Sequence, residues 1–348
     1  MFSYENLYER VFDKGIDADE LVIITGYIGP AIVEDLMFLP YKVNIYVGMY
    51  GNNISGLLHN TLITLNNQKI SINYTKMLIH SKCYIWLKDN KIIKALIGSA
   101  NFSMSGLKTP LKEVLGDILY NTYDELQLYL NLIKMDSYPV NEYSGETTSI
   151  YYIDENTKTL NATEVEISLL ASRSGGGENL LGELTSPGDV HKAAGLNWGF
   201  SNGLSLPNDA YIKIPAQLVK ENPLLFPPKR TEKNEYIDVI WDDGTKMQML
   251  LEGTQTIDDV YYPKQISTYK SKKELGLYLR KRIGDKIGMD LVIPVDSKDE
   301  FRNNIDIYKD KLINKEMLDR YGRSSINIKL IGEGTYYFDF SELKREDL

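Results

Sequence analysis

The sequence predicts a chain of two domains, an α/β first half and a mainly β second half. Residues 1–170 alternate short β-branched strands with helix-like segments, which is typical of a mixed sheet with helices packed on it as a sandwich. Residues 195–348 contain repeated short strands separated by turn residues, which favours a β-barrel or sandwich. A Gly-rich stretch at residues 172–177 separates the two patterns. The length of 348 residues accommodates two such domains.

In the first half, strands are expected at residues 20–25, 42–47, 78–87 and 92–97, with later ones at 149–153 and 165–170. Residues 30–38 have helical spacing. Residues 126–132 place leucine at every second position, which could also indicate a strand. However, residues 122–125 (Thr-Tyr-Asp-Glu) form a capping-box pattern and the run lacks β-branching until Ile133, so we expect a helix.

In the second half, strands are expected at residues 211–214, 236–241, 247–251, 289–295, 325–331 and 335–340. The turn Asp242-Asp243-Gly244 predicts a tight hairpin between two of them. The expected division of the chain is an N-terminal domain at residues 1–172, a linker at 173–194 and a C-terminal domain at 195–348.

The composition is that of a soluble globular protein, with 43% hydrophobic and 25% charged residues. Apolar runs have strand lengths rather than the length of a membrane span, and the N-terminus has neither a basic region nor an apolar core. The single cysteine, Cys83, excludes an internal disulfide and a zinc site built on several thiolates. We therefore expect a cytoplasmic protein in a reducing compartment, with no membrane association.

The net charge of −9 argues, taken alone, against nucleic acid as a partner. The distribution of charge is more informative than its sum. Basic residues gather in one segment of the second half: Lys270, Lys272, Lys273, Arg280, Lys281, Arg282 and Lys286. Such a face attracts phosphate even on an acidic protein, because fields decay within about 10 Å in physiological salt. A solvated helix face is the alternative interpretation.

Two short segments of the first half have the residue types of a catalytic site. His80-Ser81-Lys82 begins one expected strand, and Gly98-Ser99-Ala100-Asn101 ends the next. On a strand, positions 80 and 82 project to the same face. A tight turn at residues 88–90 reverses the chain, so the second segment can return to the vicinity of His80.

These residue types suit hydrolysis of a phosphodiester without metal or cofactor. A neutral His80 imidazole can attack phosphorus to form a covalent intermediate, which water then resolves. Lys82, Asn101 and Ser99 supply a cation and donors for the non-bridging oxygens. A nearby carboxylate would orient the histidine ring, and Glu113 is the candidate. A lone histidine on a strand is ordinarily structural, and the joint occurrence with the hairpin and the Gly-Ser-x-Asn segment favours catalysis.

The segment resembles the HKD motif of the phospholipase D superfamily, His-x-Lys followed by Gly-Ser-x-Asn. The usual motif has Asp five residues after the lysine, where this chain has Leu87, with Asp89 two residues further on. Phospholipases of the superfamily usually carry two motifs, yet neither His59 nor His191 begins a second one. The resemblance therefore implies a homodimer through the nuclease domain, with one His80 as nucleophile and the other as general acid.

The second half resembles the C-terminal half of NgoFVII-type restriction endonucleases, at residues 195–199, 210–215, 279–284 and 318–324. In that family this half is a B3-like pseudo-barrel that reads DNA in the major groove. Together with the HKD segment of the first half, the resemblance covers nearly the whole chain. The side-chain types that could contact bases or phosphates are Asn197, Trp198, Arg280, Arg282, Arg320 and Arg323. Surface ion pairs are the alternative for the arginines, and a core position is the alternative for Trp198.

These features predict a type II site-specific restriction endonuclease that acts on double-stranded DNA. One alternative is a site-specific DNA-binding component whose cleavage needs an ATP-dependent translocase. A lipid phosphodiesterase is disfavoured by the single motif and by the lack of an amphipathic membrane segment. The resemblance further implies a short GC-rich recognition site, and a cognate DNA methyltransferase is expected because an unprotected host would cut itself.

Overall fold

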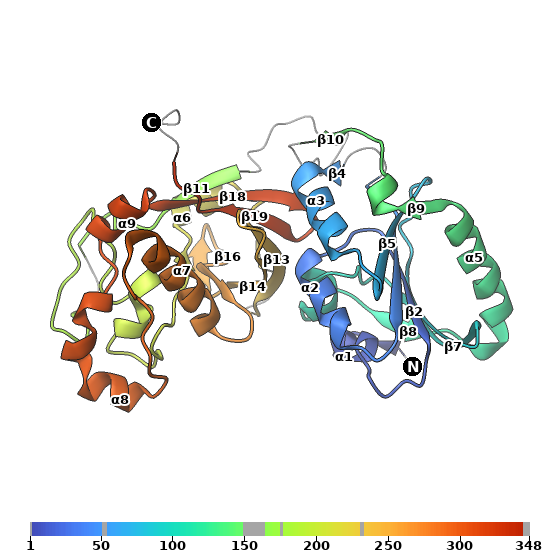
Figure 1. Cartoon of the computed structure of the whole chain (residues 1–348), viewed down its shortest axis with the longest axis horizontal. Coiled ribbons are helices and arrows are strands. Elements are labelled where there is room, and N and C mark those ends of the chain that lie inside the picture. Colours follow the sequence, from blue (N-terminus) through green and yellow to red (C-terminus); the bar gives the residue numbers. More distant parts are fainter. Residues whose placement is uncertain (1, 51–53, 149–163, 175–176, 230–232, 344–348) are drawn as a thin grey trace.

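The computed structural model describes residues 2–50, 54–148, 164–174, 177–229 and 233–343. Each half of the chain is built around its own large sheet, and the two halves lie side by side (Figure 1). This arrangement confirms the expected fold class, an α/β half followed by a mainly β half.

The first sheet has eight strands of mixed direction. In spatial order they are β1 (Phe2–Ser3), β8 (Leu115–Asp117), β7 (Lys91–Gly98), β6 (Lys82–Lys88), β2 (Glu20–Thr25), β3 (Lys42–Val47), β5 (Ile70–Thr75) and β9 (Ser137–Pro139). Strands β2, β3 and β5 are parallel, while β6 and β9 pair antiparallel with their neighbours.

Helices cover both faces of the first sheet. One face packs against α1 (Leu7–Val11), α2 (Pro30–Val33), η1 (Glu34–Phe38), α3 (Gly56–Leu65) and α4 (Met104–Lys108), and the other against α5 (Tyr123–Met135). The smaller elements of this half are β4 (Ile54–Ser55), η2 (Tyr120–Thr122), η3 (Val140–Glu142) and β10 (Thr147–Thr148). Strand β6 shows how the alternation works, since Tyr84 and Trp86 enter the first core while Cys83 and Ile85 enter the second. Figure 1 shows α5 on the side of the sheet away from the second half.

The helix expected at residues 126–132 is confirmed by α5, which buries Leu126 and Leu130. The expected capping box does not form. The Thr122 hydroxyl donates to the carbonyl of Leu119 (2.8 Å) and does not cap α5. The strand expected at residues 149–153 lies outside the described residues.

The second sheet has seven strands and curves into a nearly closed barrel. In order they are β11 (Glu164–Ser168), β18 (Ser325–Gly332), β19 (Thr335–Asp339), β13 (Glu235–Trp241), β14 (Lys246–Glu252), β17 (Gln265–Thr268) and β12 (Ile212–Lys213). The pair β13–β19 is parallel and the other pairs are antiparallel. The hairpin expected at Asp242-Asp243-Gly244 joins β13 and β14, with Gly244 at φ +84°.

The remaining elements of the second half surround this barrel. They are η4 (Gly195–Phe200), α6 (Ala216–Glu221), β15 (Gln255–Ile257), β16 (Val260–Tyr262), α7 (Lys272–Ile287), α8 (Lys298–Asn303), η5 (Ile305–Lys311) and α9 (Lys315–Tyr321). Helix α7 inserts Leu275, Leu279 and Ile283 into the barrel core, at the spacing of one helix face.

Strand β11 corrects the assignment of residues 165–170 to the first half. It pairs antiparallel with β18 and places Val165 and Ile167 in the core of the second half. The described part of the expected linker also packs there. Val190 is 1% exposed and forms an isolated bridge with Leu170. Residues 164–168 and the described part of the expected linker therefore pack with the second half.

The strand expected at residues 289–295 is not formed. Instead of a neighbouring strand, the side chains of Asn208 and Arg280 form hydrogen bonds with the backbone of this segment. Asn208 Nδ2 donates to the carbonyl of Ile293 (2.8 Å) and its Oδ1 accepts from the Ile293 amide (2.9 Å). Arg280 donates to the carbonyl of Leu291 (3.3 Å). The apolar alternation thus marked an irregular segment that buries Leu291 and Ile293, whose backbone groups are bonded by side chains of neighbouring elements.

Asp238 of β13 lies at the contact between the two halves and is fully buried. One carboxylate oxygen accepts from the amide of Met104 (2.7 Å) and the other from the amide of Ile32 (3.1 Å). A single carboxylate of the second half therefore satisfies amides in the first turns of α4 and α2. A Cβ at position 29 would lie 2.1 Å from Asp238 Oδ2, so Gly29 is needed for this approach.

Replacing Asp238 with alanine is expected to lower the free energy of unfolding by about 2–4 kcal/mol, because two buried amides lose their acceptor. Urea denaturation measures this change. The matched control is Asp35→Ala, which removes a partly exposed carboxylate that accepts from the side chains of Tyr8 and Gln248. Its expected loss is about 1 kcal/mol or less. Equal losses in the two variants would contradict the role assigned to Asp238.

Candidate active site

The hairpin β6–β7 brings the two candidate catalytic segments together. Asp89 and Asn90 in its turn have φ values of +50° and +59°, the conformation of a two-residue turn that matches strand twist. Lys82 at the start of β6 is paired in register with Gly98 at the end of β7. The chain after Gly98 therefore returns beside His80, as the sequence predicted.

His80 lies just before β6 and its side chain is exposed. Its ring stands edge-on to Tyr27, with centroids 6.2 Å apart. Gly26 separates it from Asn101. A Cβ at position 26 would lie 3.0 Å from His80 Cδ2 and 3.3 Å from Asn101 Oδ1. The imidazole and the amide thus flank the same small residue, and the imidazole is open to solvent.

The orientation of the Asn101 side chain is fixed by its neighbours. Its Oδ1 accepts from the amide of Tyr27 (3.1 Å) and lies 3.3 Å from the Thr25 hydroxyl. The same hydroxyl accepts from the amide of Phe102 (3.0 Å). Because a backbone amide can only donate, Nδ2 must face the other way. There it donates to Glu333 Oε2 (2.8 Å).

Lys82, the expected cation of the candidate site, is 3% exposed. Its Nζ donates to the carbonyl of His80 (2.6 Å), which ties the lysine to the histidine segment. Burial lowers the pKa of Lys82, and the charges of Glu333 and Glu113 oppose this shift.

The lowered pKa of Lys82 predicts a fall in kcat/KM at alkaline pH, with a midpoint below the ordinary lysine value of 10.5. The physical reason is that the ammonium is charged mainly below its pKa, and the expected role of this charge is to stabilise the phosphoryl oxygens. In Lys82→Arg the guanidinium stays charged, so the fall should move to higher pH even where the rate is reduced. An unchanged midpoint in Lys82→Arg would show that another group causes the fall. The measurement is the pH profile of DNA cleavage.

Ser99 and Glu113 lie on adjacent segments at the edge of this site. The Ser99 hydroxyl accepts from the amide of Val114 (3.1 Å), and the Ser99 amide donates to the carbonyl of Val114 (3.1 Å). Glu113 is close enough for its charge to act on Lys82. Among the contacts of the described residues, none joins Glu113 to His80. Its orienting role for His80 therefore stays a prediction.

Two groups of this site were missed by the sequence analysis. Thr25 ends β2, and its hydroxyl donates to the carbonyl of Tyr27 (2.7 Å) and accepts from the amide of Phe102, so it holds the two backbone segments beside the Asn101 side chain. A threonine that follows four buried apolar residues in a strand is a weak signal for such a role. Glu333 comes from the turn between β18 and β19, in the other half of the chain. Nothing in its local pattern connects it with His80.

The structure does not place two of the expected DNA contacts on the surface. Asn197 and Arg280 are both 0% exposed. Asn197 Nδ2 donates to the carbonyl of Ile313 (2.7 Å), and Arg280 donates to the carbonyls of Lys311 (2.6 Å) and Leu196 (3.2 Å). Both side chains hold irregular backbone segments together, so in this conformation neither can reach a base edge.

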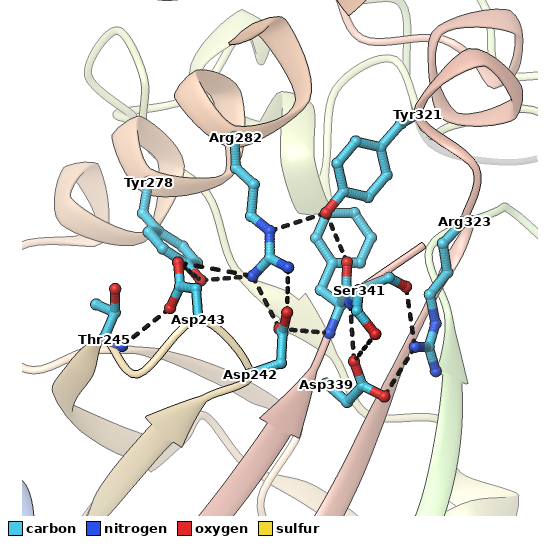
Figure 2. A network of polar contacts seen from close by, with 10 residues as sticks. Asp242, Asp243, Thr245, Tyr278, Arg282, Tyr321, Arg323, Asp339 and Ser341 are labelled. Atoms are coloured by element: carbon cyan, nitrogen blue, oxygen red, sulfur yellow. Dashed lines mark hydrogen bonds and ion pairs between the residues drawn. The ribbon is translucent and has the colours of Figure 1, made fainter. Parts of the chain in front are cut away.

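Arg282 and Arg323 belong to a network of polar contacts beside α7 and α9 (Figure 2). Arg282 forms an ion pair with Asp242, and its Nε donates to the Tyr321 hydroxyl (2.8 Å). Arg323 pairs with Asp339 at 3.1 Å. The ion-pair alternative thus describes both arginines in the free protein.

Arg320 and Trp198 are more accessible. Arg320 is exposed, and its Nη2 donates to the carbonyl of Ile287 (2.6 Å). Trp198 is half-buried, with the Lys272 ammonium 4.3 Å from its ring centroid and Tyr211 edge-on at 5.5 Å. Contact of Arg320 and Trp198 with DNA remains a prediction.

Neither a metal-binding cluster nor a membrane-spanning helix is present among the residues that the structure describes. No group of three or more His, Cys, Asp or Glu side chains lies together there in a way that could hold a metal ion. In the same part of the chain, every helix is too short or too polar to cross a membrane.

A mixed sheet whose hairpin gathers His80, Lys82 and Asn101, followed by a nearly closed barrel, defines a protein of the phospholipase D class with an added β-rich domain. Residues 5–147 match the NgoFVII restriction endonuclease N-terminal PLD domain. Residues 158–309 match the NgoFVII C-terminal B3-like DNA-binding domain. The chain therefore belongs to the NgoFVII restriction endonuclease family and combines a nuclease domain with a DNA-binding domain.

Solved structures with some similarity cover only part of the chain. Nuc, a phospholipase D family member from Salmonella typhimurium, covers 40% of this chain and 93% of its own, with 16% identity and a TM-score of 0.31. NucT from Helicobacter pylori covers 40% and 99%, with 16% identity and a TM-score of 0.30. Polyphosphate kinase from Porphyromonas gingivalis covers 40% and 23%, with 11% identity and a TM-score of 0.28. The comparison with curated proteins gives no match.

Proposed function

We propose that the chain is a type II restriction endonuclease that hydrolyses DNA phosphodiester bonds without a metal ion. The observation that carries the proposal is the meeting of an exposed imidazole, a buried ammonium and an oriented amide at one end of the β6–β7 hairpin. These three groups supply a nucleophile, a fixed positive charge and a hydrogen-bond donor, which are the needs of phosphoryl transfer.

In the proposed reaction His80 attacks phosphorus, so that a P–N bond forms and the bond from phosphorus to the leaving oxygen breaks. A second imidazole, as imidazolium, gives its proton to the leaving oxygen. The same imidazole, now neutral, takes a proton from water as the water attacks phosphorus and the P–N bond breaks. Lys82 and the Asn101 amide stabilise the charge on the non-bridging oxygens in both steps.

The second imidazole is proposed to be His80 of a second copy of the chain. Each chain has one His-x-Lys segment, and the reaction needs both a nucleophile and an acid. A twofold arrangement of nuclease domains would supply both from one residue position. A cytoplasmic homodimer, joined through the nuclease domain, is therefore part of the proposal.

Sequence specificity is assigned to the second domain, because the family description of that domain is DNA-binding. We propose a short GC-rich duplex site and a cognate methyltransferase that protects the host. The second candidate function is a DNA-binding component that cuts only with an ATP-dependent translocase. It is favoured by one observation, the carboxylate of Glu333 bonded to Asn101 inside the catalytic site.

The test is incubation of the purified protein with a large unmethylated DNA in EDTA. Discrete fragments would support a metal-independent, site-specific nuclease. Intact DNA under EDTA but discrete fragments with Mg²⁺ would overturn the metal-free mechanism. Site-specific binding without cutting in either condition would favour the partner-dependent alternative.

A further inference from the structure

Glu333 reaches the catalytic site from the second domain. It lies in the turn between β18 and β19, 232 residues after Asn101, and its Oε2 accepts from Asn101 Nδ2 at 2.8 Å. Glycines flank it on both sides, and one of them, Gly334, fits closely against the first half. A Cβ at Gly334, where φ is +62°, would lie 2.7 Å from the Cβ of Ser105. The turn is therefore shaped for this contact.

The Glu333 carboxylate accepts a hydrogen bond from Asn101 Nδ2, the donor that a bound phosphate would need. Asn101 Oδ1 is bonded to the Tyr27 amide on the inner side, so Nδ2 is the part of the side chain that faces the site. The charge of Glu333 also acts on Lys82, whose pKa it raises against the effect of burial. A carboxylate and a phosphodiester are both anions and accept from the same kinds of donors. Both cannot occupy this position together.

The position of this turn is coupled to the contact between the domains. The Asp238 amide donates to the carbonyl of Gly334 (2.9 Å), and Asp238 is paired in register with Thr335. The Asp238 side chain holds the amides of Met104 and Ile32 in the first domain. One residue thus bonds both the Glu333 turn and the helices beside the site. A shift of the second domain would break the bonds from the Asp238 side chain to Met104 and Ile32 and withdraw Glu333, while the bond between Asp238 and Gly334 moves with the second domain.

We propose that Glu333 occupies the phosphate position of the nuclease site in the free protein and leaves it when the second domain moves on binding DNA. This inference rests on the proposed function of His80, Lys82 and Asn101. The consequence is that the nuclease site prefers DNA that the second domain recognises. DNA that the second domain does not recognise must displace Glu333 against the interdomain contacts, so it is cut slowly.

The test compares Glu333→Ala and Glu333→Gln with wild type. The control Glu342→Ala removes one carboxylate from the same domain, where it pairs with Lys286. The substrate is a short oligothymidylate, which contains no duplex recognition site. Cleavage of this strand is expected to rise by about tenfold or more in Glu333→Ala, with a smaller rise in Glu333→Gln and none in Glu342→Ala. Adding His80→Ala to Glu333→Ala should remove the increase.

Binding of inorganic phosphate, measured by calorimetry on the same proteins, gives a readout that needs no cleavage. We expect about tenfold tighter phosphate binding in Glu333→Ala and no change in Glu342→Ala. Tighter phosphate binding with no DNA cleavage by any protein would keep the occlusion and overturn the nuclease function. Thermal unfolding of each variant is compared with that of wild type, and only variants that unfold at the wild-type temperature are compared for cleavage and phosphate binding. If Glu333→Ala does not fold, Glu333→Gln replaces it, because glutamine has the same size as glutamate.

Three results would overturn the inference. The first is unchanged phosphate affinity in both Glu333 variants. The second is tighter phosphate binding without faster oligothymidylate cleavage, in a protein that cuts duplex DNA at specific sites. The third is a loss of all cleavage in Glu333→Gln, since this would make Glu333 a working part of the site instead of an occupant that leaves.

Discussion

His80→Ala is expected to abolish DNA cleavage, with a loss of about 10⁴-fold or more, while site-specific DNA binding is retained. In the proposed reaction the same residue position supplies both the nucleophile and the general acid, so one substitution removes both from a dimer. The loss should affect kcat, because the DNA-binding domain is untouched. Gel-shift titration and single-turnover cleavage on the same DNA separate the two effects.

The matched control is His191→Ala, which removes an imidazole from the second half, where Nδ1 contacts the Thr185 hydroxyl at 3.3 Å. It should cut at close to the wild-type rate. A mixing experiment tests the dimer. If equal amounts of wild type and His80→Ala exchange subunits freely, about a quarter of the dimers keep both histidines, so activity should fall to about a quarter of the wild-type value per dimer. Half of the wild-type activity would instead indicate that each chain cuts alone, and full activity in His80→Ala would refute the mechanism.

The hairpin that carries the candidate catalytic residues could be predicted from the sequence because its turn signal is local. A tight turn whose residues tolerate positive φ joins β6 and β7 and pairs Lys88 with Lys91. A register shift between Trp86 and Leu87 then moves the pairing by one residue, so that Lys82 pairs with Gly98. Glu333 and Asp238 could not be found in this way. Each acts on residues more than a hundred positions away, through a contact between domains that strand alternation does not encode.

The burial of Arg280 is a different kind of failure, because the sequence did contain a signal for it. Gly276 and Gly284 lie one helical turn away from Arg280 on each side, and so mark the same face of α7. A Cβ at position 276 would lie 1.6 Å from the Asn208 carbonyl oxygen, and one at 284 would lie 2.4 Å from that of Met289. Glycines at this spacing indicate a face packed closely against backbone. An arginine between them donates to carbonyls inside the protein, instead of facing DNA.

Asn101→Ala is expected to lower the rate of cleavage by about 10²–10³-fold, the effect of losing one donor to the developing charge. The structure allows a sharper test with Asn101→Asp. Aspartate keeps an oxygen that can accept from the Tyr27 amide, so the loop keeps its inner hydrogen bond. It lacks the Nδ2 donor and adds a negative charge opposite Glu333. Asn101→Asp should therefore cut at least as slowly as Asn101→Ala.

The two substitutions separate the donor from the loop that holds it. If Asn101 acted only by holding the loop through Tyr27, Asn101→Asp would cut much faster than Asn101→Ala. If the Nδ2 donor is needed for cleavage, the rates of Asn101→Ala and Asn101→Asp both fall. Adding Glu333→Ala to Asn101→Asp then restores only the part of the rate that was lost to charge repulsion. Single-turnover cleavage by wild type, Asn101→Asp, Glu333→Ala and the double variant forms a double-mutant cycle. A coupling energy near zero between positions 101 and 333 would show that their hydrogen bond does not influence cleavage, because independent sites contribute additively.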